Sequence, residues 1–200
     1  MEPIKISHKK LYPMTSHIAD VAGIYAWYYD YTNLIDILNG HGSKDLIISS
    51  FLQELENISR KLKLPNLSGT LKGKLNTEYS CLIENIDYIK VKSYDTKMAS
   101  VNLDMLKQVI YVLQNYSAPL YIGKAVKQSI RERYKQHIKD YDDAEAGNDF
   151  KNKFGYRLHK IGLSPSQLIF KYHKLPNREI EIDIIEHIIN RINKPTLGER

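Results

Sequence analysis

The sequence predicts an α+β fold. Apolar residues recur at helical spacing in five stretches. Aromatic and β-branched residues gather in three short segments typical of strands. Glycine, proline and acidic turns separate these segments. The 200 residues suit one domain, 1–200, or one domain that carries a large insertion. A hydrophobic fraction of 42% is typical of a globular chain that buries a core.

The first predicted strand covers residues 21–29 and is rich in tyrosine and β-branched residues. A second short strand is expected at 119–123, where Gly123 ends the strand or lets another backbone approach closely. Residues 167–173 alternate like a third strand. Apolar residues in 79–94 indicate one or two further strands.

The five predicted helices cover residues 43–64, 101–115, 129–141, 150–160 and 178–192. Gly162 is a plausible C-cap for the fourth helix, and Pro195 follows the end of the last. Residues 61–74 are expected to form a loop. This loop is either a solvated basic segment or one that contacts phosphates. Its lysines are Lys61, Lys63, Lys72 and Lys74.

The formal net charge of +6 and the pI of about 9.1 favour an anionic partner, most commonly nucleic acid. The one cysteine, Cys81, excludes an internal disulfide, and no cysteine cluster is present to hold zinc. A reducing, cytoplasmic location fits this composition. We expect no membrane partner, because no signal peptide and no apolar run of about 18 residues occurs.

The tripeptides at residues 23–25 and 121–123, together with an arginine, a histidine, a glutamate and a proline further along the chain, form an ordered set. Together they resemble the GIY-YIG nuclease family. The resemblance covers residues 21–29 and 118 to the C-terminus. Each tripeptide alone is a weak signal, but the ordered set with its spacing is specific. The set consists of Gly23-Ile24-Tyr25, Tyr121-Ile122-Gly123, Arg133 with His137 four positions later, and Glu186 with Pro195 nine positions later.

This resemblance implies a small antiparallel sheet of about three strands flanked by helices. It also implies that Tyr25 and Tyr121 lie side by side on neighbouring strands. Their separation of 96 positions is much longer than is usual in the family. A large, mostly helical insertion over residues 30–117 is therefore expected between the first two core strands. Long surface insertions cost little extra closure entropy, and we expect this one to contact DNA.

Phosphodiester hydrolysis needs a nucleophilic water, a base, a cation on the developing charge and help for the leaving oxygen. The resemblance implies that Tyr25 and Tyr121 position and deprotonate the water. A tyrosine, with an ordinary pKa near 10, serves as a base only if its pKa is lowered or a neighbour relays the proton. Lys124 can lower a phenol's pKa or bind phosphate; its alternative is an ordinary surface lysine.

Arg133 is the candidate for holding the scissile phosphate, because its planar fork binds two oxygens and its charge never titrates. His137 lies one helical turn later and can relay a proton or hydrogen-bond the phosphate. The family's spacing from the second tripeptide selects Arg131 instead. The four-residue gap to the histidine selects Arg133, which we prefer, and Arg131 is assigned to DNA binding.

Glu186 is the candidate ligand for Mg²⁺ or Mn²⁺. A carboxylate in so apolar a stretch is expensive to bury unless it is paired, and Mg²⁺ takes one or two carboxylates plus waters and substrate oxygens. The alternative places Glu186 on the solvent side of its helix, paired with a lysine or arginine. One departure from the family is Gly198, which stands where an asparagine is usual. Asn190 and Asn193 are close in sequence but not in place.

These residues predict a metal-dependent endonuclease that hydrolyses double-stranded DNA. The residues in and around both tripeptides resemble the restriction-endonuclease branch of the family in particular. This resemblance implies a sequence-specific enzyme that acts as a homodimer. Two alternatives stay open. One is a structure-specific repair or mobile-element nuclease. The other is a catalytically inactive DNA-binding module, which Gly198 favours.

Overall fold

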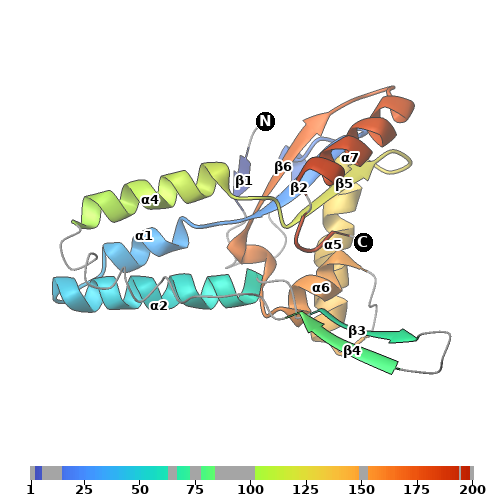
Figure 1. The fold of residues 1–200 in the computed structure, drawn as a ribbon. Coiled ribbons are helices and arrows are strands. Elements are labelled where there is room, and N and C mark those ends of the chain that lie inside the picture. Colours follow the sequence, from blue (N-terminus) through green and yellow to red (C-terminus); the bar gives the residue numbers. More distant parts are fainter. Residues whose placement is uncertain are drawn as a thin grey trace.

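The computed structural model describes residues 3–5, 15–62, 67–72, 78–83, 102–148, 153–193 and 195–198. Its central sheet has the order β1-β6-β2-β5, and every neighbouring pair is antiparallel. The strands are β1 (Pro3–Lys5), β2 (Gly23–Tyr29), β5 (Tyr121–Ala125) and β6 (Leu168–Lys174). The predicted α+β class and small antiparallel sheet are therefore confirmed, and β5 lies at one edge (Figure 1).

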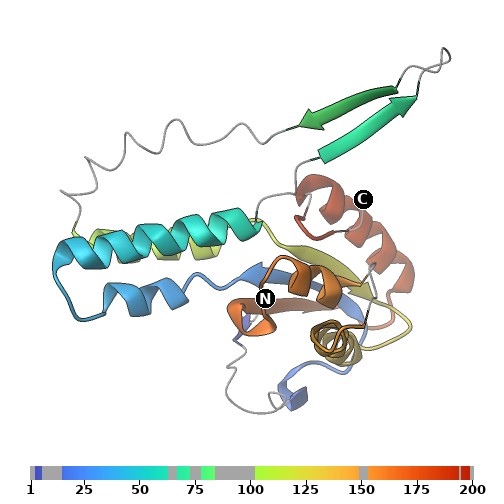
Figure 2. The same ribbon diagram turned by 90° about the horizontal axis from the view of Figure 1, so that it is seen from below.

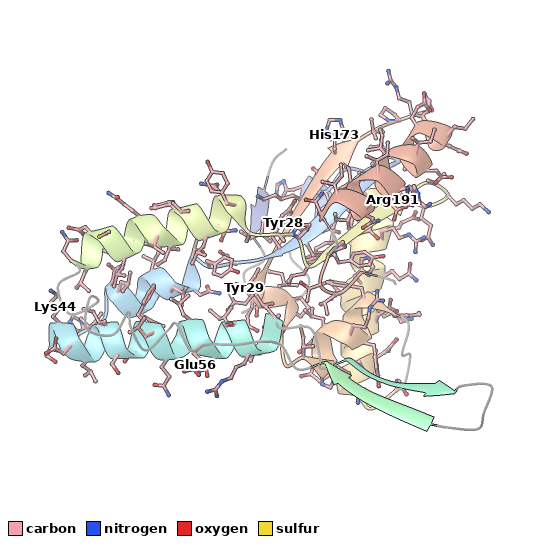
Figure 3. The ribbon with its side chains drawn as sticks, in the orientation of Figure 1. Tyr28, Tyr29, Lys44, Glu56, His173 and Arg191 are labelled. Atoms are coloured by element: carbon pink, nitrogen blue, oxygen red, sulfur yellow. The ribbon has the colours of Figure 1, made fainter. Side chains whose placement is uncertain are left out.

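The side chains of β2 alternate between two apolar clusters, as the pleat of a strand requires. Tyr25, Trp27 and Tyr29 join the larger cluster on one face, whereas Ile24 joins the smaller one on the other. Tyr28 and Tyr29 accordingly leave the strand on opposite sides (Figure 3). The aromatic stretch of the sequence is thus buried on both faces of the sheet.

Helices cover both faces of the sheet (Figure 2). On the larger cluster lie α5 (Ile130–Glu145) and α6 (Phe154–Lys160). The Trp27 ring stacks on Tyr134 at 5.5 Å and on Phe154 at 5.6 Å between centroids, which fixes both helices against β2. On the opposite face lies α7 (Glu179–Asn193), which buries Ile182 completely.

Local signals explain where these helices begin and end. Ser129 and Glu132 form a capping box at the start of α5. Gly162 follows the C-cap of α6 with φ +68°, a conformation that favours glycine, so the predicted stop is confirmed. Two short 3₁₀ turns, η1 (Thr15–His17) and η3 (Pro165–Gln167), complete the elements around the sheet.

Three helices lie side by side away from the sheet (Figures 1 and 2). They are α1 (Asn33–Leu38), α2 (Lys44–Leu62) and α4 (Leu103–Tyr116). The sequence predicted α2 and α4 but missed α1, which is too short to show a period. Asp30 supports the turn into α1, because its carboxylate accepts hydrogen bonds from the backbone N–H and the hydroxyl of Thr32.

A second, two-stranded antiparallel sheet joins β3 (Leu67–Lys72) to β4 (Glu78–Ile83). The predicted loop at 61–74 is therefore wrong in part: Lys61 belongs to α2, and residues 67–72 form a strand. The predicted strand at 79–94 overlaps β4, and its residues 84–94 lie outside the described ranges.

The helices α1, α2 and α4 and the β3–β4 pair all fall between β2 and β5 along the chain. A mostly helical insertion over 30–117 stays a prediction, because residues 63–66, 73–77 and 84–101 lie outside the described ranges. Among the helices of the described residues, none has the length and apolar character needed to cross a membrane.

Candidate functional site

The pairing of β2 with β5 brings the two tripeptides together. Tyr25 lies opposite Gly123, and Tyr121 lies opposite Trp27. The rings of Tyr25 and Tyr121 are 6.2 Å apart between centroids, and their hydroxyls are hydrogen-bonded. The structure thus places the two tyrosines side by side, on the face of the sheet that α5 covers.

Gly123 leaves the space that the Tyr25 side chain occupies. A Cβ at this position would lie 2.5 Å from the Tyr25 hydroxyl oxygen and 2.8 Å from Cε1 of Tyr121. The sequence predicted a strand end or a close approach of backbone, but the close neighbour is the Tyr25 ring. Gly23 meets the backbone instead, since a Cβ there would collide with the carbonyl oxygen of His173 on β6.

Tyr25 and His137 form a buried hydrogen bond of 2.8 Å between the phenol oxygen and Nε2. Their side chains are 2% and 7% exposed. Burial raises the pKa of Tyr25 well above its usual value; Tyr121 adds to this rise and the charge of Arg133 opposes it. Burial, together with the charges of Arg133, Arg157 and Lys153, lowers the pKa of His137 to about 3.

These shifts fix the protonation of the pair at neutral pH. The phenol of Tyr25 keeps its proton, and the imidazole of His137 is neutral. The phenol donates to Nε2 in the tautomer that carries its proton on Nδ1, and it accepts from Nε2–H in the other tautomer. Tyr25 is therefore not a phenolate at neutral pH, and it can take a proton from water only if its own proton passes to a neighbour.

Arg133 and Arg131, the two candidate arginines, have different surroundings. Arg133 donates only to the amide oxygen of Gln136, at 3.1 Å, and has no carboxylate partner among the described residues. Arg131 donates to the carbonyl oxygen of Ile18 at 2.9 Å and to Asp20 at 3.0 Å. Arg131 thus ties α5 to the segment before β2, and its role in DNA binding stays a prediction. The charge of Arg133 acts on both Tyr25 and His137.

Arg157 on α6 is a site residue that sequence reasoning missed. Its guanidinium carbon lies 5.8 Å from the centroid of the Tyr121 ring, and its charge acts on His137. No sequence spacing relates Arg157 to either tripeptide. Only the packing of α6 on α5 brings it to the site, so no local pattern would have found it.

Glu186 on α7 reaches the same edge of the sheet from the other face. Its Oε1 accepts a hydrogen bond from Asn190 at 2.6 Å, and its side chain is 22% exposed. It lines a pocket of about 220 Å³ with Tyr121 and Asn190. Asn190 does not stand at the family's asparagine position along the chain, but its i, i+4 spacing places its amide on Glu186.

Lys124 lies on the α7 side of β5 and not beside the phenols. Its Nζ is 3.0 Å from Asp183 and 3.4 Å from Glu186, and these carboxylates raise its pKa. The charges that act on Tyr25 come from Tyr121, Arg133 and Glu186. The expectation that Lys124 lowers a phenol's pKa therefore does not hold for Tyr25.

Gly198 lies in a turn that has no room for a side chain. Its backbone N–H donates to the carbonyl oxygen of Pro195 at 3.1 Å, and a Cβ would lie 2.8 Å from Cγ of Pro195. The adjacent Leu197 donates its N–H to Leu120 at 2.7 Å, which ties this turn to the start of β5. An asparagine would not fit at 198 without moving the proline.

A divalent cation at Glu186 would have few protein ligands. Within the described ranges, no group of three or more His, Cys, Asp or Glu side chains gathers. Mg²⁺ or Mn²⁺ bound there would have Glu186 as its carboxylate and would take waters and substrate oxygens for the rest. The Glu186 carboxylate faces the pocket, but Lys124 shares it, so a cation and this lysine compete for the same oxygens.

Of the four lysines assigned to DNA contact, Lys61 is the one whose side chain the structure describes. Lys61 is partly exposed near the end of α2. Lys72 ends β3, of which only the backbone is described. Lys63 and Lys74 lie outside the described residues.

No protein-family model matches the chain. Neither a curated protein nor a solved structure matches it. The function must therefore be argued from the site itself.

Proposed function

We propose that this protein is a metal-dependent endonuclease of the GIY-YIG type that hydrolyses phosphodiester bonds of double-stranded DNA. The observation that carries the proposal is the buried 2.8 Å hydrogen bond between Tyr25 and His137. It lies beside Arg133, which has no carboxylate partner among the described residues, and at the strand edge that Glu186 reaches from the other face.

The chain's own residues account for the proton and the phosphate. Arg133 holds the non-bridging oxygens of the scissile phosphate. As water attacks phosphorus, its proton passes to the Tyr25 oxygen while the phenol proton moves to Nε2 of His137. Burial and the neighbouring positive charges keep the pKa of His137 low, and the incoming phosphate charge offsets the second of these two causes. The P–O bond to the leaving oxygen breaks as the bond to water forms.

A cation at Glu186 supplies Lewis-acid stabilisation of the phosphate and of the leaving oxygen. Asn190 orients the carboxylate through its hydrogen bond. Tyr121 lies between the two halves of the site, since it touches Tyr25 on one side and lines the Glu186 pocket on the other.

Cleavage of phage-sized duplex DNA in Mg²⁺ and in EDTA tests the proposal. We expect cleavage that needs Mg²⁺ and is lost in Glu186→Gln. Glu145→Gln, an exposed residue at the end of α5, is the control of matched chemistry and should cleave normally. Discrete fragments support a sequence-specific restriction enzyme. A smear removes that specificity and favours a repair or mobile-element nuclease. DNA binding without cleavage overturns the proposal in favour of an inactive binding module.

The outer side of α7 supports a homodimer, which we propose as the working form. Four isoleucines at intervals of four residues are exposed along this helix, and together they make an apolar strip of the kind that marks interfaces. They are Ile180, Ile184, Ile188 and Ile192, with exposures of 76%, 54%, 49% and 75%. Rows at i, i+4 pack against the same rows of a second helix.

Charge on α7 favours a second copy in antiparallel orientation. Glu179 and Glu181 lie in its first turn and Arg191 in its last. A two-fold axis across the helix would bring the acidic turn of one copy to the basic turn of the other. Such symmetry suits an enzyme that cuts both strands.

The state of association in solution tests the dimer. Light scattering should give a dimer for the wild type and a monomer for Ile188→Lys. The control Tyr116→Lys changes an exposed residue of α4 and should stay dimeric. A monomeric wild type at micromolar concentration overturns this part of the proposal. A cytoplasmic location, which suits the single Cys81, remains part of the proposal.

A further inference from the structure

Three cations act on the buried His137, and they differ in how they are compensated. Lys153 forms an ion pair of 2.9 Å with Asp140, whose side chain is buried. Arg133 bonds only to the neutral amide of Gln136. The Arg157 side chain forms no hydrogen bond or ion pair within the described residues, and its one charge-specific contact is the Tyr121 ring. Among the described residues, two guanidinium groups whose charges act on His137 therefore have no carboxylate partner.

Both arginines also bury a donor that has no partner. Nε of Arg133 and Nε of Arg157 are both shielded from solvent without a hydrogen bond. Burying an unsatisfied donor of a charged group costs free energy. Two such groups at one place are expected where an anion completes the arrangement, because a guanidinium binds phosphate oxygens through paired N–H donors.

The backbone holds Arg157 at this place. Gly155 packs against α5 so closely that a Cβ would lie 2.7 Å from the carbonyl oxygen of His137. Phe154, beside it, is held in the aromatic cluster at 5.1 Å from the His137 ring. Arg157 follows within the same turn of α6. Its position relative to His137 is thus fixed by close helix packing and not by a flexible loop.

We propose that Arg157 is a second phosphate-binding residue, and that with Arg133 it forms a two-arginine clamp for a phosphate group of the nucleic-acid backbone. Arg133 approaches this group from α5 and Arg157 from α6, on the side of the Tyr121 ring. The identity of the anion rests on the proposed function. The clamp itself rests on the two uncompensated guanidinium groups.

The salt dependence of DNA binding measures each arginine separately. A labelled 20-base-pair duplex is titrated in EDTA, where no cleavage occurs, from low to moderate salt. Loss of one phosphate contact lowers the slope of log K against log salt by about 0.9. We expect this change, with roughly tenfold weaker binding at low salt, for Arg157→Gln and for Arg133→Gln.

Two variants control the experiment. Arg60→Gln removes an exposed arginine of α2 that is already paired with Glu56, and its slope should equal that of the wild type. Arg157→Lys keeps a positive charge at the same position and should restore most of the slope. Thermal melting of each variant in chloride reports whether the fold is intact.

Inorganic phosphate separates this inference from the proposed function. At matched ionic strength, phosphate should raise the melting temperature of the wild type relative to chloride, and Arg157→Gln should lose that rise. If phosphate binds through Arg157 but no DNA is cleaved, the clamp stands and the nuclease proposal fails. If DNA is cleaved, and Arg157→Gln changes neither the slope nor the phosphate effect, the nuclease stands and the clamp is overturned.

Discussion

Replacing Gly123 by alanine tests the central contact of the site. The added Cβ would lie 2.5 Å from the Tyr25 hydroxyl oxygen and 2.6 Å from its Cζ. Ordinary contact distances are longer by about 1 Å. Tyr25 is 2% exposed and packs against His137 and Phe170, so its ring has little room to move.

Overpacking of this kind costs about 1–3 kcal/mol, and we expect that loss in the free energy of unfolding of Gly123→Ala, measured in urea. A displacement of about 1 Å at a reacting group costs on the order of 100-fold in rate. Cleavage of a defined duplex should therefore fall by about that factor.

A double-mutant cycle shows whether Tyr25 is the cause. In a Tyr25→Leu background, the two closest contacts are removed and only the one with Cε1 of Tyr121 remains, so Gly123→Ala should cost less stability than in the wild type. Equal costs in the two backgrounds would refute the reasoning, as would a Gly123→Ala protein of full stability and full activity.

Three further predictions follow from the same geometry. The pKa of His137 is about 3 in the fold, below its ordinary 6.5, so between these two pH values the unfolded chain binds a proton that the folded protein does not. The folded protein therefore has its full stability above pH 6.5 and loses stability as the pH falls toward 3. Acid titration of the unfolding free energy should show this loss, up to about 1.4 kcal/mol per pH unit, in the wild type and in the exposed control His187→Gln, but not in His137→Gln. Gly155→Ala should lower the urea midpoint, because the backbone carbonyl 2.7 Å from the new Cβ cannot rotate away; an unchanged midpoint would contradict the close helix contact. Arg131→Gln should cost at most about 1 kcal/mol, as its ion pair with Asp20 is partly exposed, and leave cleavage intact; a cleavage defect as large as that of Arg133→Gln would return the catalytic role to Arg131.

Much of the fold was predictable because its signals are local. The helical spacing of Leu46 to Leu62 and the aromatic run before Tyr29 mark α2 and β2 without any tertiary information. With six residues, α1 has too few turns for the helical spacing of its apolar residues to be recognised in the sequence. The six residues of β3 hold two leucines four positions apart, with a serine, a glycine and a threonine between them, so neither an alternating nor a helical pattern marks the strand.

The site divides in the same way. Tyr25, Tyr121 and the pair of Arg133 and His137 follow from motif and spacing, since two strands and one helix carry them. The partners of Glu186 and the surroundings of Lys124 depend on which face of the sheet α7 covers. Arg157 depends on the packing of α6 against α5. Which face of the sheet a helix covers depends on tertiary packing, and the spacing of residues along the chain does not predict it.

The placement of α7 has a consequence for how activity and folding relate. The helix is held to the sheet by the smaller apolar cluster, whose fully buried member from α7 is Ile182, with Ile185 and Ile189 only partly buried. The Tyr25–His137 pair belongs to the larger cluster on the opposite face. Local opening of the more weakly held element would remove Glu186 while the tyrosine and histidine stay in contact. We therefore expect cleavage to disappear at urea concentrations where the fluorescence of the buried Trp27 is still native. Cleavage would then depend on the local stability of α7, which would be lower than the stability of the whole fold.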